Sequence, residues 1–194
     1  PDDLRRTRPY APPEKGRPVR LFSCARLNVV KGHQDLMSAV RQLLDQGIDV
    51  RLEIAGEDDD GGKGFRAELE DHLKKLRLRD HVRLLGAIDA TEVRAKLENA
   101  HLFVLASWHE PLGVAYMEAM SMGVPVIGTE AGGVRELIED GKTGYLVAPR
   151  NPGALARAVR ALLQSPDALA RLSRAGRAHV ERNFHARLGA ETLA

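Results

Sequence analysis

The stretch HLFVLASWHEPLGVAYMEAMSMGVPVIG, residues 101–128, decides the fold. It contains a short apolar run, a loop, an apolar helical segment over 113–122 and a second short apolar run. The two runs, 101–106 and 124–128, show no internal alternation of polar and apolar residues, which is typical of strands buried on both faces. Two such strands joined by a helix form the repeating unit of a parallel sheet.

The same alternation of strands and helices continues along the chain. It predicts an α/β fold: a doubly wound, Rossmann-like parallel sheet of about six strands with helices on both faces. A (β/α)8 barrel is the alternative, but it needs roughly 250 residues and eight units. The further strands are expected at 19–25, 50–55, 82–85 and 144–147, and the further helices at 32–47, 65–77, 90–99, 132–139, 152–164 and 167–182.

The length of 194 residues suits one domain with flanking segments. Residues 1–18, rich in proline and charge, are expected to be a linker or arm, residues 19–183 the domain, and residues 184–194 a tail that is truncated. Because the chain starts at Pro1, we expect a preceding natural segment to be absent.

The composition argues against a nucleic-acid-binding protein. The net charge is +2 with basic and acidic residues interleaved, and aromatic residues make up only 4%. The single cysteine, Cys24, excludes an intramolecular disulfide framework. No apolar stretch approaches the ~20 residues needed to span a bilayer. We expect a cytoplasmic protein, with peripheral contact to the inner membrane as an option for a full-length protein.

Two cations flank the start of the first predicted helix. Arg26 follows the first strand and Lys31 precedes the helix in the stretch ARLNVVKGH. Helix N-termini favour anions, so this loop is a candidate phosphate site; the plain alternative is that both are surface charges. Neither a G-x-G-x-x-G nor a P-loop sequence is present, so side-chain cations and helix ends would have to hold the phosphate.

The apolar helix carries one charged residue, Glu118, and a buried unpaired carboxylate costs several kcal/mol. Either ligand hydroxyls or a basic residue such as Arg135 must therefore hold Glu118. Glu110 lies in the preceding loop and is either a ligand-binding or an ordinary loop acid. Gly113 opens the helix and lets a ligand approach the main chain closely.

Three further features surround these loops. Gly132 and Gly133 stand at another helix start, where a capping role is expected. Trp108 is expected to be a rim or packing residue. The stretch LGAID, residues 85–89, ends a strand at the same edge, where its main chain could meet a flat base.

The sequence EPLGVAYME, residues 110–118, is a Glu-x7-Glu motif that resembles retaining glycosyltransferases of the GT-B fold, family four. The flanking EAMSMGVPVIGTEAGGVRELIEDGKTGYLV and the upstream CARLNVVKG are similar to the same family. The resemblance covers about residues 19–165 and implies the C-terminal, nucleotide-sugar-binding half of a two-domain enzyme. Family members often have Gly-Phe-Gly where this chain has Pro111-Leu112-Gly113, and proline removes one N–H donor.

The resemblance assigns a role to each candidate residue. Arg26 and Lys31 would bind the donor diphosphate and stabilise the leaving group, and with Glu110 they form the expected catalytic set. Glu118 would accept hydrogen bonds from the ribose diol, and Glu110 would hold hydroxyls of the donor sugar. The main chain of Leu112, Gly113 and Val114 would hold sugar hydroxyls or phosphate, and that of Ile88 would meet the base.

The resemblance also implies the partners of the reaction. The donor would be a nucleotide diphosphate sugar, a UDP- or GDP-sugar above all, and no metal or other cofactor would be required. The acceptor, a sugar or a lipid-linked glycan, would bind the missing N-terminal half, so the isolated chain would be inactive. Two alternatives stay open: an isomerase similar to sugar-nucleotide 2-epimerases, and a non-enzymatic nucleotide-sugar-binding module.

Overall fold

The computed structural model of the protein describes residues 6–58 and 64–183. Within these residues a six-stranded parallel sheet has the strand order β3-β2-β1-β4-β5-β6, which confirms the predicted doubly wound fold. The strands are β1 (Val19–Cys24), β2 (Val50–Ala55), β3 (Val82–Gly86), β4 (Leu102–Val104), β5 (Val126–Thr129) and β6 (Tyr145–Val147).

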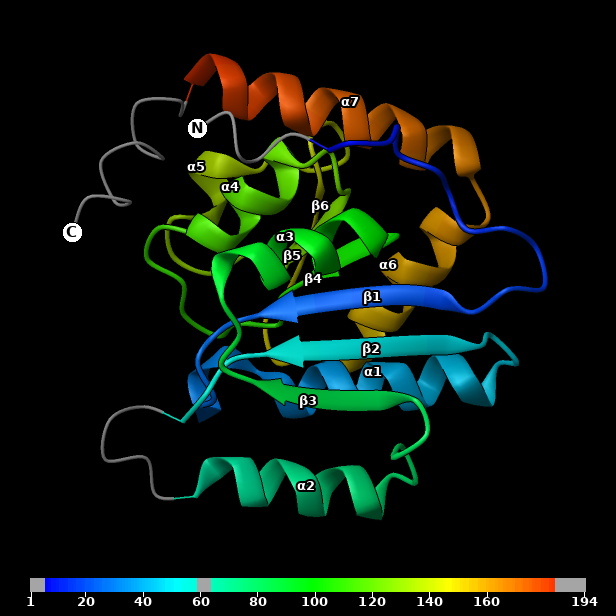
Figure 1. Ribbon diagram of the computed structural model, residues 1–194, viewed down its shortest axis with the longest axis vertical. Helices are drawn as coiled ribbons and strands as arrows, with labels where there is room; N and C mark the ends of the chain where they lie inside the picture. Colours follow the sequence, from blue (N-terminus) through cyan, green and yellow to red (C-terminus); the bar gives the residue numbers. More distant parts are fainter. Residues whose placement is uncertain (1–5, 59–63, 184–194) are drawn as a thin grey trace.

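The strand order reverses between β1 and β4. From β1 the chain moves outward to β2 and β3, and it then returns to β4 on the other side of β1 and moves outward to β5 and β6. The arrowheads of β1, β2 and β3 all point to the left of Figure 1. In such sheets the loops after the strands flanking the reversal diverge and leave a crevice at the carboxyl edge.

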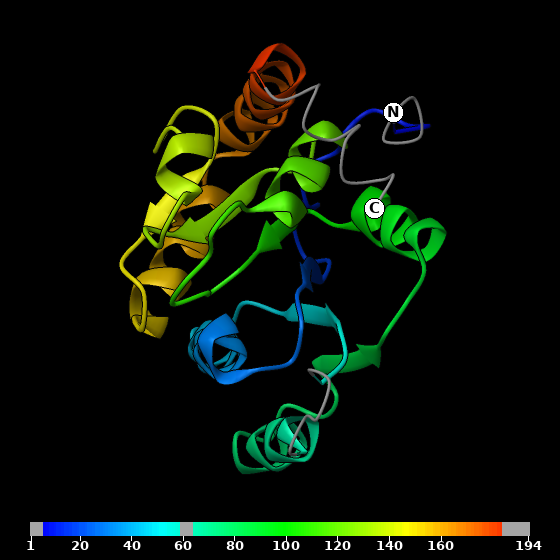
Figure 2. The same cartoon turned by 90° about the vertical axis from the view of Figure 1, so that its left-hand side faces the viewer.

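Helices cover both faces of the sheet, as Figure 2 shows with the strands seen nearly end-on. One face packs against α1 (His33–Asp45), α2 (Phe65–Lys75) and α6 (Pro152–Leu163). The other packs against α3 (Ala90–Asn99), α4 (Val114–Ser121) and α5 (Val134–Leu137). The long α7 (Pro166–Asn183) contributes Leu169 to the first core and Val180 to the second.

Aromatic packing fixes α4 against the sheet. Phe22 on β1, Phe103 on β4 and Tyr116 on α4 form two edge-to-face pairs, with ring centroids 6.1 and 5.8 Å apart. The Tyr116 hydroxyl donates to the carbonyl of Leu105 at 3.2 Å, and Gly128 makes room for it, because a Cβ there would lie 2.6 Å from the hydroxyl oxygen. The helix that carries Glu118 is therefore held rigidly.

The predicted helix over 132–139 is wrong in extent, because α5 covers only Val134–Leu137. Ile138 is extended, and the next N–H, that of Glu139, donates to the side chain of Thr143 at 2.9 Å instead of continuing the helix. A local side-chain acceptor competes here with the helical hydrogen bond.

The amino-terminal segment packs onto the end of α3. The Thr7 N–H donates to Glu98 at 2.9 Å, and the Tyr10 hydroxyl donates to the carbonyl of His101 at 2.9 Å. The expected tail, 184–194, and residues 59–63 of an acidic loop lie outside the described residues. Within the part of the chain that is described, no helix is both long and apolar enough to cross a membrane.

Candidate functional site

The candidate residues lie in the loops at the carboxyl edge of the sheet, the edge that faces the viewer in Figure 2. The loop after β1 contains a short 3-10 helix, η2 (Val29–Lys31), before α1 begins. The loop after β4, residues 105–113, leads into α4. Because β1 and β4 are neighbours in the sheet, these two loops lie side by side at the point where the strand order reverses.

An ion pair joins the two loops. The Nζ atom of Lys31 lies 2.8 Å from Oε2 of Glu110, and the two side chains are only 12% and 13% exposed. The Ser107 hydroxyl lies 3.4 Å from the same carboxylate oxygen. Two residues predicted separately for the site, 79 positions apart in the sequence, are thus in direct contact.

The main chains of the two loops are also in contact. The Trp108 N–H donates to the carbonyl of Val30 at 2.7 Å. Gly32 has a φ of 65° and lies so close to the other loop that a Cβ there would be 2.0 Å from the carbonyl oxygen of Ala106. Only glycine satisfies both conditions without strain.

The side chain of Trp108 connects three elements. Its indole Nε1 donates to Asp35 on α1 at 2.7 Å, and the guanidinium of Arg150 lies over its ring, 4.3 Å from the centroid. Trp108 is thus a packing residue, as expected, and its side chain links the loop after β4 to α1. The sequence offers no signal for Asp35 and Arg150 as its partners.

Arg26 is exposed and directly follows the end of β1. Its main-chain carbonyl contacts the side chain of a buried histidine. Nε2 of the buried His33 lies 3.0 Å from the Arg26 carbonyl and donates to it. Burial, opposed in part by this hydrogen bond, lowers the pKa of His33, and the charge of Lys31 lowers it further. A neutral histidine therefore supports the Arg26 loop, a role that sequence reasoning missed.

Glu118 is half-buried and faces the end of β1. Burial, and secondly the negative charge of Glu118, raise the pKa of the Cys24 thiol to about 11. The alternative partner Arg135 forms an ion pair with Glu130 at 2.7 Å. The carboxylate of Glu118 thus lies beside the strand that leads to Arg26.

Cys24, the single cysteine of the chain, can report the charge of Glu118. We expect Glu118→Gln to speed alkylation of Cys24 by iodoacetamide at pH 8.5 by roughly two- to fivefold, because loss of the negative charge favours the thiolate. Mass spectrometry of timed samples measures the rate. Glu68→Gln, an exposed carboxylate on α2, should leave it unchanged. Equal rates in all three proteins would place Glu118 away from the thiol.

The main chain at the start of α4 lies at the same carboxyl edge of the sheet. Gly113 has a φ of 70° and precedes Val114, the first residue of the helix, while the Leu112 side chain is 53% exposed. The first helical hydrogen bonds run from Tyr116 and Met117 to the carbonyl of Gly113, at 3.0 and 3.2 Å. Helix geometry gives the N–H groups before Tyr116 no acceptor within the helix.

Gly132 and Gly133 support the Glu110 loop, and do more than begin α5. A Cβ on Gly132 would lie 2.4 Å from the carbonyl oxygen of Glu110, and one on Gly133 would lie 2.2 Å from that of Pro111. The Gly133 N–H donates to the Glu110 carbonyl at 3.0 Å. These glycines allow two main chains to touch, which the expected capping role did not include.

Ile88 lies after β3, toward the other end of this edge. Its side chain is half-buried and packs against the second core, so the main chain is what it offers to a ligand. The preceding turn is braced by Glu57, whose Oε2 accepts a hydrogen bond from the Ala87 N–H at 3.3 Å. The structure joins Lys31 with Glu110 and places Glu118 near β1, but it shows no direct contact between Ile88 and these residues.

The chain is similar to known proteins both in sequence and in fold. The family described as "Glycosyl transferases group 1" matches residues 6–179. Glycogen synthase of Mycobacterium tuberculosis H37Rv is 35% identical over 168 residues, which cover 86% of this chain and 39% of that protein. The putative colanic acid biosynthesis glycosyltransferase WcaL of Escherichia coli K12 is 33% identical over 190 residues, covering 94% and 46%.

Solved structures with the same fold include three relatives at 26% identity. Sucrose-phosphate synthase from Thermosynechococcus elongatus superimposes with a TM-score of 0.82, over 95% of this chain and 48% of that one. Anabaena HepE in complex with UDP-glucose gives 0.81, over 91% and 49%. The C-terminal domain of a group 1 glycosyl transferase (LpcC) from Francisella tularensis gives 0.77, over 90% and 95%.

These matches extend over most of the chain, and the chain spans less than half the length of the two curated relatives given above, 39% and 46%. The part that matches contains both loops of the candidate site, with Lys31 and Glu110 in contact. The fold that these relatives share is the Rossmann-like half of a GT-B architecture. On this evidence of sequence and fold, the chain belongs to the glycosyl transferases of group 1.

Proposed function

We propose that this chain is the donor-binding domain of a retaining glycosyltransferase of family four, which moves a sugar from a nucleotide diphosphate sugar to an acceptor. The observation that carries the proposal is the contact between Lys31 and Glu110 at 2.8 Å. It places a cation for phosphate and a carboxylate for hydroxyls within one small volume at the carboxyl edge. The complexes of HepE with UDP and with UDP-glucose support the choice of ligand.

In this proposal Arg26 and Lys31 bind the diphosphate. Lys31 has three N–H donors, so it can keep its contact with Glu110 and still donate to a phosphate oxygen. When the bond between the anomeric carbon and the diphosphate oxygen breaks, its electron pair goes to the diphosphate, and both cations stabilise the added charge. The N–H groups at the start of α4 also stabilise the negative charge of the diphosphate.

Glu118 accepts hydrogen bonds from the two ribose hydroxyls. A carboxylate that receives two hydroxyl hydrogens is tolerated in a half-buried position, which would explain a glutamate in an otherwise apolar helix. The main chain of Ile88 meets the base. In this proposal the base contacts main-chain groups of the turn after β3. The choice between UDP- and GDP-sugars therefore rests on the geometry of that turn.

Glu110 holds hydroxyls of the donor sugar. Its contacts with Lys31 and Ser107 both use Oε2, and Oε1 would accept the hydroxyl hydrogen. The main chain of Leu112, Gly113 and Val114 completes this subsite. The acceptor oxygen would then bond to the anomeric carbon on the face that the diphosphate leaves, which gives retention of configuration, and the proton of the acceptor hydroxyl would pass to the departing diphosphate.

The remainder of the enzyme is also part of the proposal. The matched relatives are longer than this chain, and we propose that the acceptor, a sugar or lipid-linked glycan, binds a second domain. The isolated chain would then bind donor without transferring sugar. Protein cations would supply the positive charge, so that transfer needs no added metal, and the protein would work in the cytoplasm. The transferase names of the relatives favour transfer over epimerisation or mere sensing.

Calorimetric titration of the 194-residue chain with UDP, GDP, ADP and their sugar conjugates tests the proposal. We expect saturable binding of one nucleotide series. Glu118→Ala should weaken it at least about tenfold, because charge-assisted hydrogen bonds are worth about 1.5–3 kcal/mol.

Glu68→Ala on α2 is the matched control and should bind as the unmodified chain does. Thermal unfolding of the unmodified chain and of both variants is also measured without ligand. A stability loss in Glu118→Ala together with unchanged nucleotide affinity would mean that Glu118 serves the fold, and the proposed ribose contact would be abandoned.

A further inference from the structure

A pocket of about 440 Å³ lies on the sheet, away from the candidate donor site. It is bounded by the amino-terminal halves of β1, β2 and β3 and by the end of α3, and we call it the sheet-face pocket. Its volume is within the range of small-molecule sites. Its charged lining residues are four cations, Arg20, Arg51, Arg83 and Lys96, and two acids, Glu53 and Asp80, and the polar residues His81 and Asn99 also line it.

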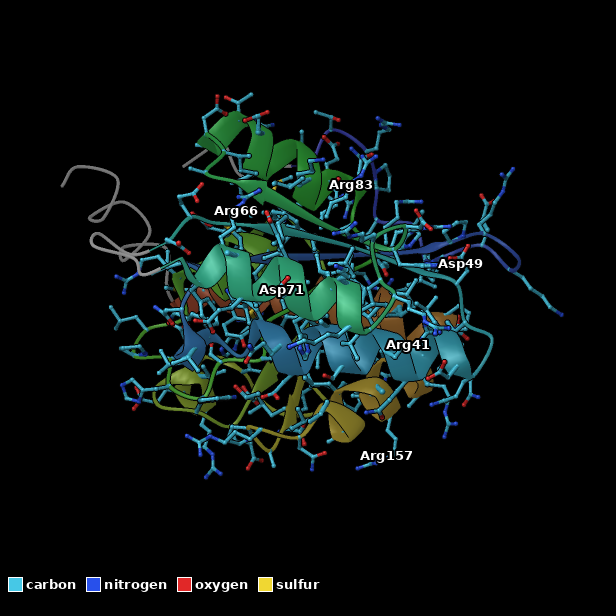
Figure 3. The ribbon with its side chains drawn as sticks, turned by 90° about the horizontal axis from the view of Figure 1, so that it is seen from below. Arg41, Asp49, Arg66, Asp71, Arg83 and Arg157 are labelled. Atoms are coloured by element: carbon cyan, nitrogen blue, oxygen red, sulfur yellow. The ribbon has the colours of Figure 1, made fainter. Side chains whose placement is uncertain are left out.

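A sequence triplet creates this pocket. Each of the three strands begins with Val-Arg-Leu: residues 19–21, 50–52 and 82–84. Side chains alternate along a strand, so the valine and leucine of each triplet face the core under α1 and α2, and the arginine faces the other side. Figure 3 shows Arg83 on the side of the sheet occupied by α3, whereas Arg41 and Arg157 lie on the opposite side.

Arginines are unexpected at positions 20 and 51. β1 and β2 lie inside the sheet, where the strands of a doubly wound fold are normally apolar on both faces, whereas β3 with Arg83 is an edge strand. Arg20 and Arg51 are register partners on adjacent strands, and like charges directly opposite one another are destabilising. A feature that breaks a local rule without a gain in stability points to function.

The neighbouring acids neutralise these cations only in part. Glu53 pairs with Lys96 at 2.8 Å, and Arg51 lies 3.4 Å from Asp49. Arg20 donates to the carbonyl of Asn99 at 2.6 Å, which carries no full charge. Arg83 is exposed and forms no ion pair with any described residue, so its guanidinium is available to a ligand.

The inner wall of the pocket is apolar. Phe22 and Ala100, 1% and 4% exposed, line it beneath the ring of cations, and both belong to the core on the α3 side of the sheet. An apolar wall with several guanidinium groups around it suits an organic molecule that carries a phosphate, because guanidinium binds phosphate through two parallel hydrogen bonds. Strand geometry puts Arg20 and Arg26 roughly 20 Å apart, so one small ligand cannot reach both.

We infer that the sheet-face pocket is a second ligand site of this chain, which binds a small phosphorylated molecule of the size of a sugar phosphate. The arginines of the three Val-Arg-Leu triplets hold the phosphate, and Phe22 and Ala100 contact the organic part. This site is independent of the nucleotide-sugar site at the carboxyl edge.

Calorimetric titration of the 194-residue chain with glucose 6-phosphate, inorganic phosphate and glucose tests the inference. We expect saturable binding of glucose 6-phosphate, weaker binding of phosphate and none of glucose. Arg83→Gln should raise the dissociation constant about tenfold, and Arg83→Lys should give an intermediate value because the charge remains but the paired hydrogen bonds are lost.

Two control variants locate the binding. Arg157→Gln removes an exposed arginine from the opposite face, and Arg26→Gln removes one from the donor edge; both should bind glucose 6-phosphate unchanged. No saturable binding would overturn the inference. So would a loss of binding in Arg26→Gln with full binding in Arg83→Gln, which would place the phosphate at the donor edge. Neither result depends on nucleotide affinity, so the proposed function is tested separately.

Discussion

Replacing Gly32 with alanine is expected to lower the free energy of unfolding by about 3 kcal/mol, because two costs add at this position. The residue has a φ of 65°, a left-handed conformation that costs an alanine about 1–2 kcal/mol. Its new Cβ would also lie 2.0 Å from the carbonyl oxygen of Ala106 and would push the loops after β1 and β4 apart. Urea unfolding followed by circular dichroism measures the change.

Gly47 provides a matched control at the end of α1. Its φ is 78°, but a Cβ there meets no atom within 4 Å. Gly47→Ala should therefore cost only the conformational term, about 1 kcal/mol. An equal loss in both variants would show that the loops separate freely, and the close contact of Gly32 with Ala106 would then contribute nothing to stability.

Replacing Lys31 with methionine is expected to cost about 3 kcal/mol of stability at pH 7.5, the usual price of removing one partner from a buried ion pair. The change keeps most of the side-chain volume and leaves the Glu110 carboxylate, 13% exposed, with the Ser107 hydroxyl at 3.4 Å. Chemical denaturation of the single variants and of the double variant measures this loss and the coupling between the residues.

The double variant Lys31→Met/Glu110→Gln should recover most of the stability, since a neutral amide replaces the stranded charge. The coupling free energy between the two positions should be about 2 kcal/mol. Additive losses in the double variant, or a single loss below about 0.5 kcal/mol, would show that the pair behaves as a surface ion pair.

The fold could be predicted from the sequence because each element carries its own local signal. Short runs rich in apolar or β-branched residues mark every strand, and amphipathic spacing with glycine stops marks α1. The errors fall at element ends, where a single contact decides the outcome. The Thr143 hydroxyl, which ends α5 early, is one such contact.

The sequence indicates which residues could share the candidate site, but not how they contact one another. Arg26, Lys31, Glu110 and Glu118 could be assigned to one edge of the sheet, because parallel strands place their carboxyl ends together. That Lys31 touches Glu110 depends on how two loops fold against each other, which local patterns do not encode. The supports of those loops, such as His33 under Arg26, were missed for the same reason.

The packing of the glycine pair at 132–133 has a consequence for engineering. These glycines contact the main-chain oxygens of Glu110 and Pro111 and not their side chains, and both Pro111 and Leu112 are exposed. The position of the loop therefore depends little on which side chains stand at 111 and 112. A substitution library at these two positions can change the surface shown to a bound molecule while the scaffold beneath stays intact, which makes them the natural place to begin altering selectivity.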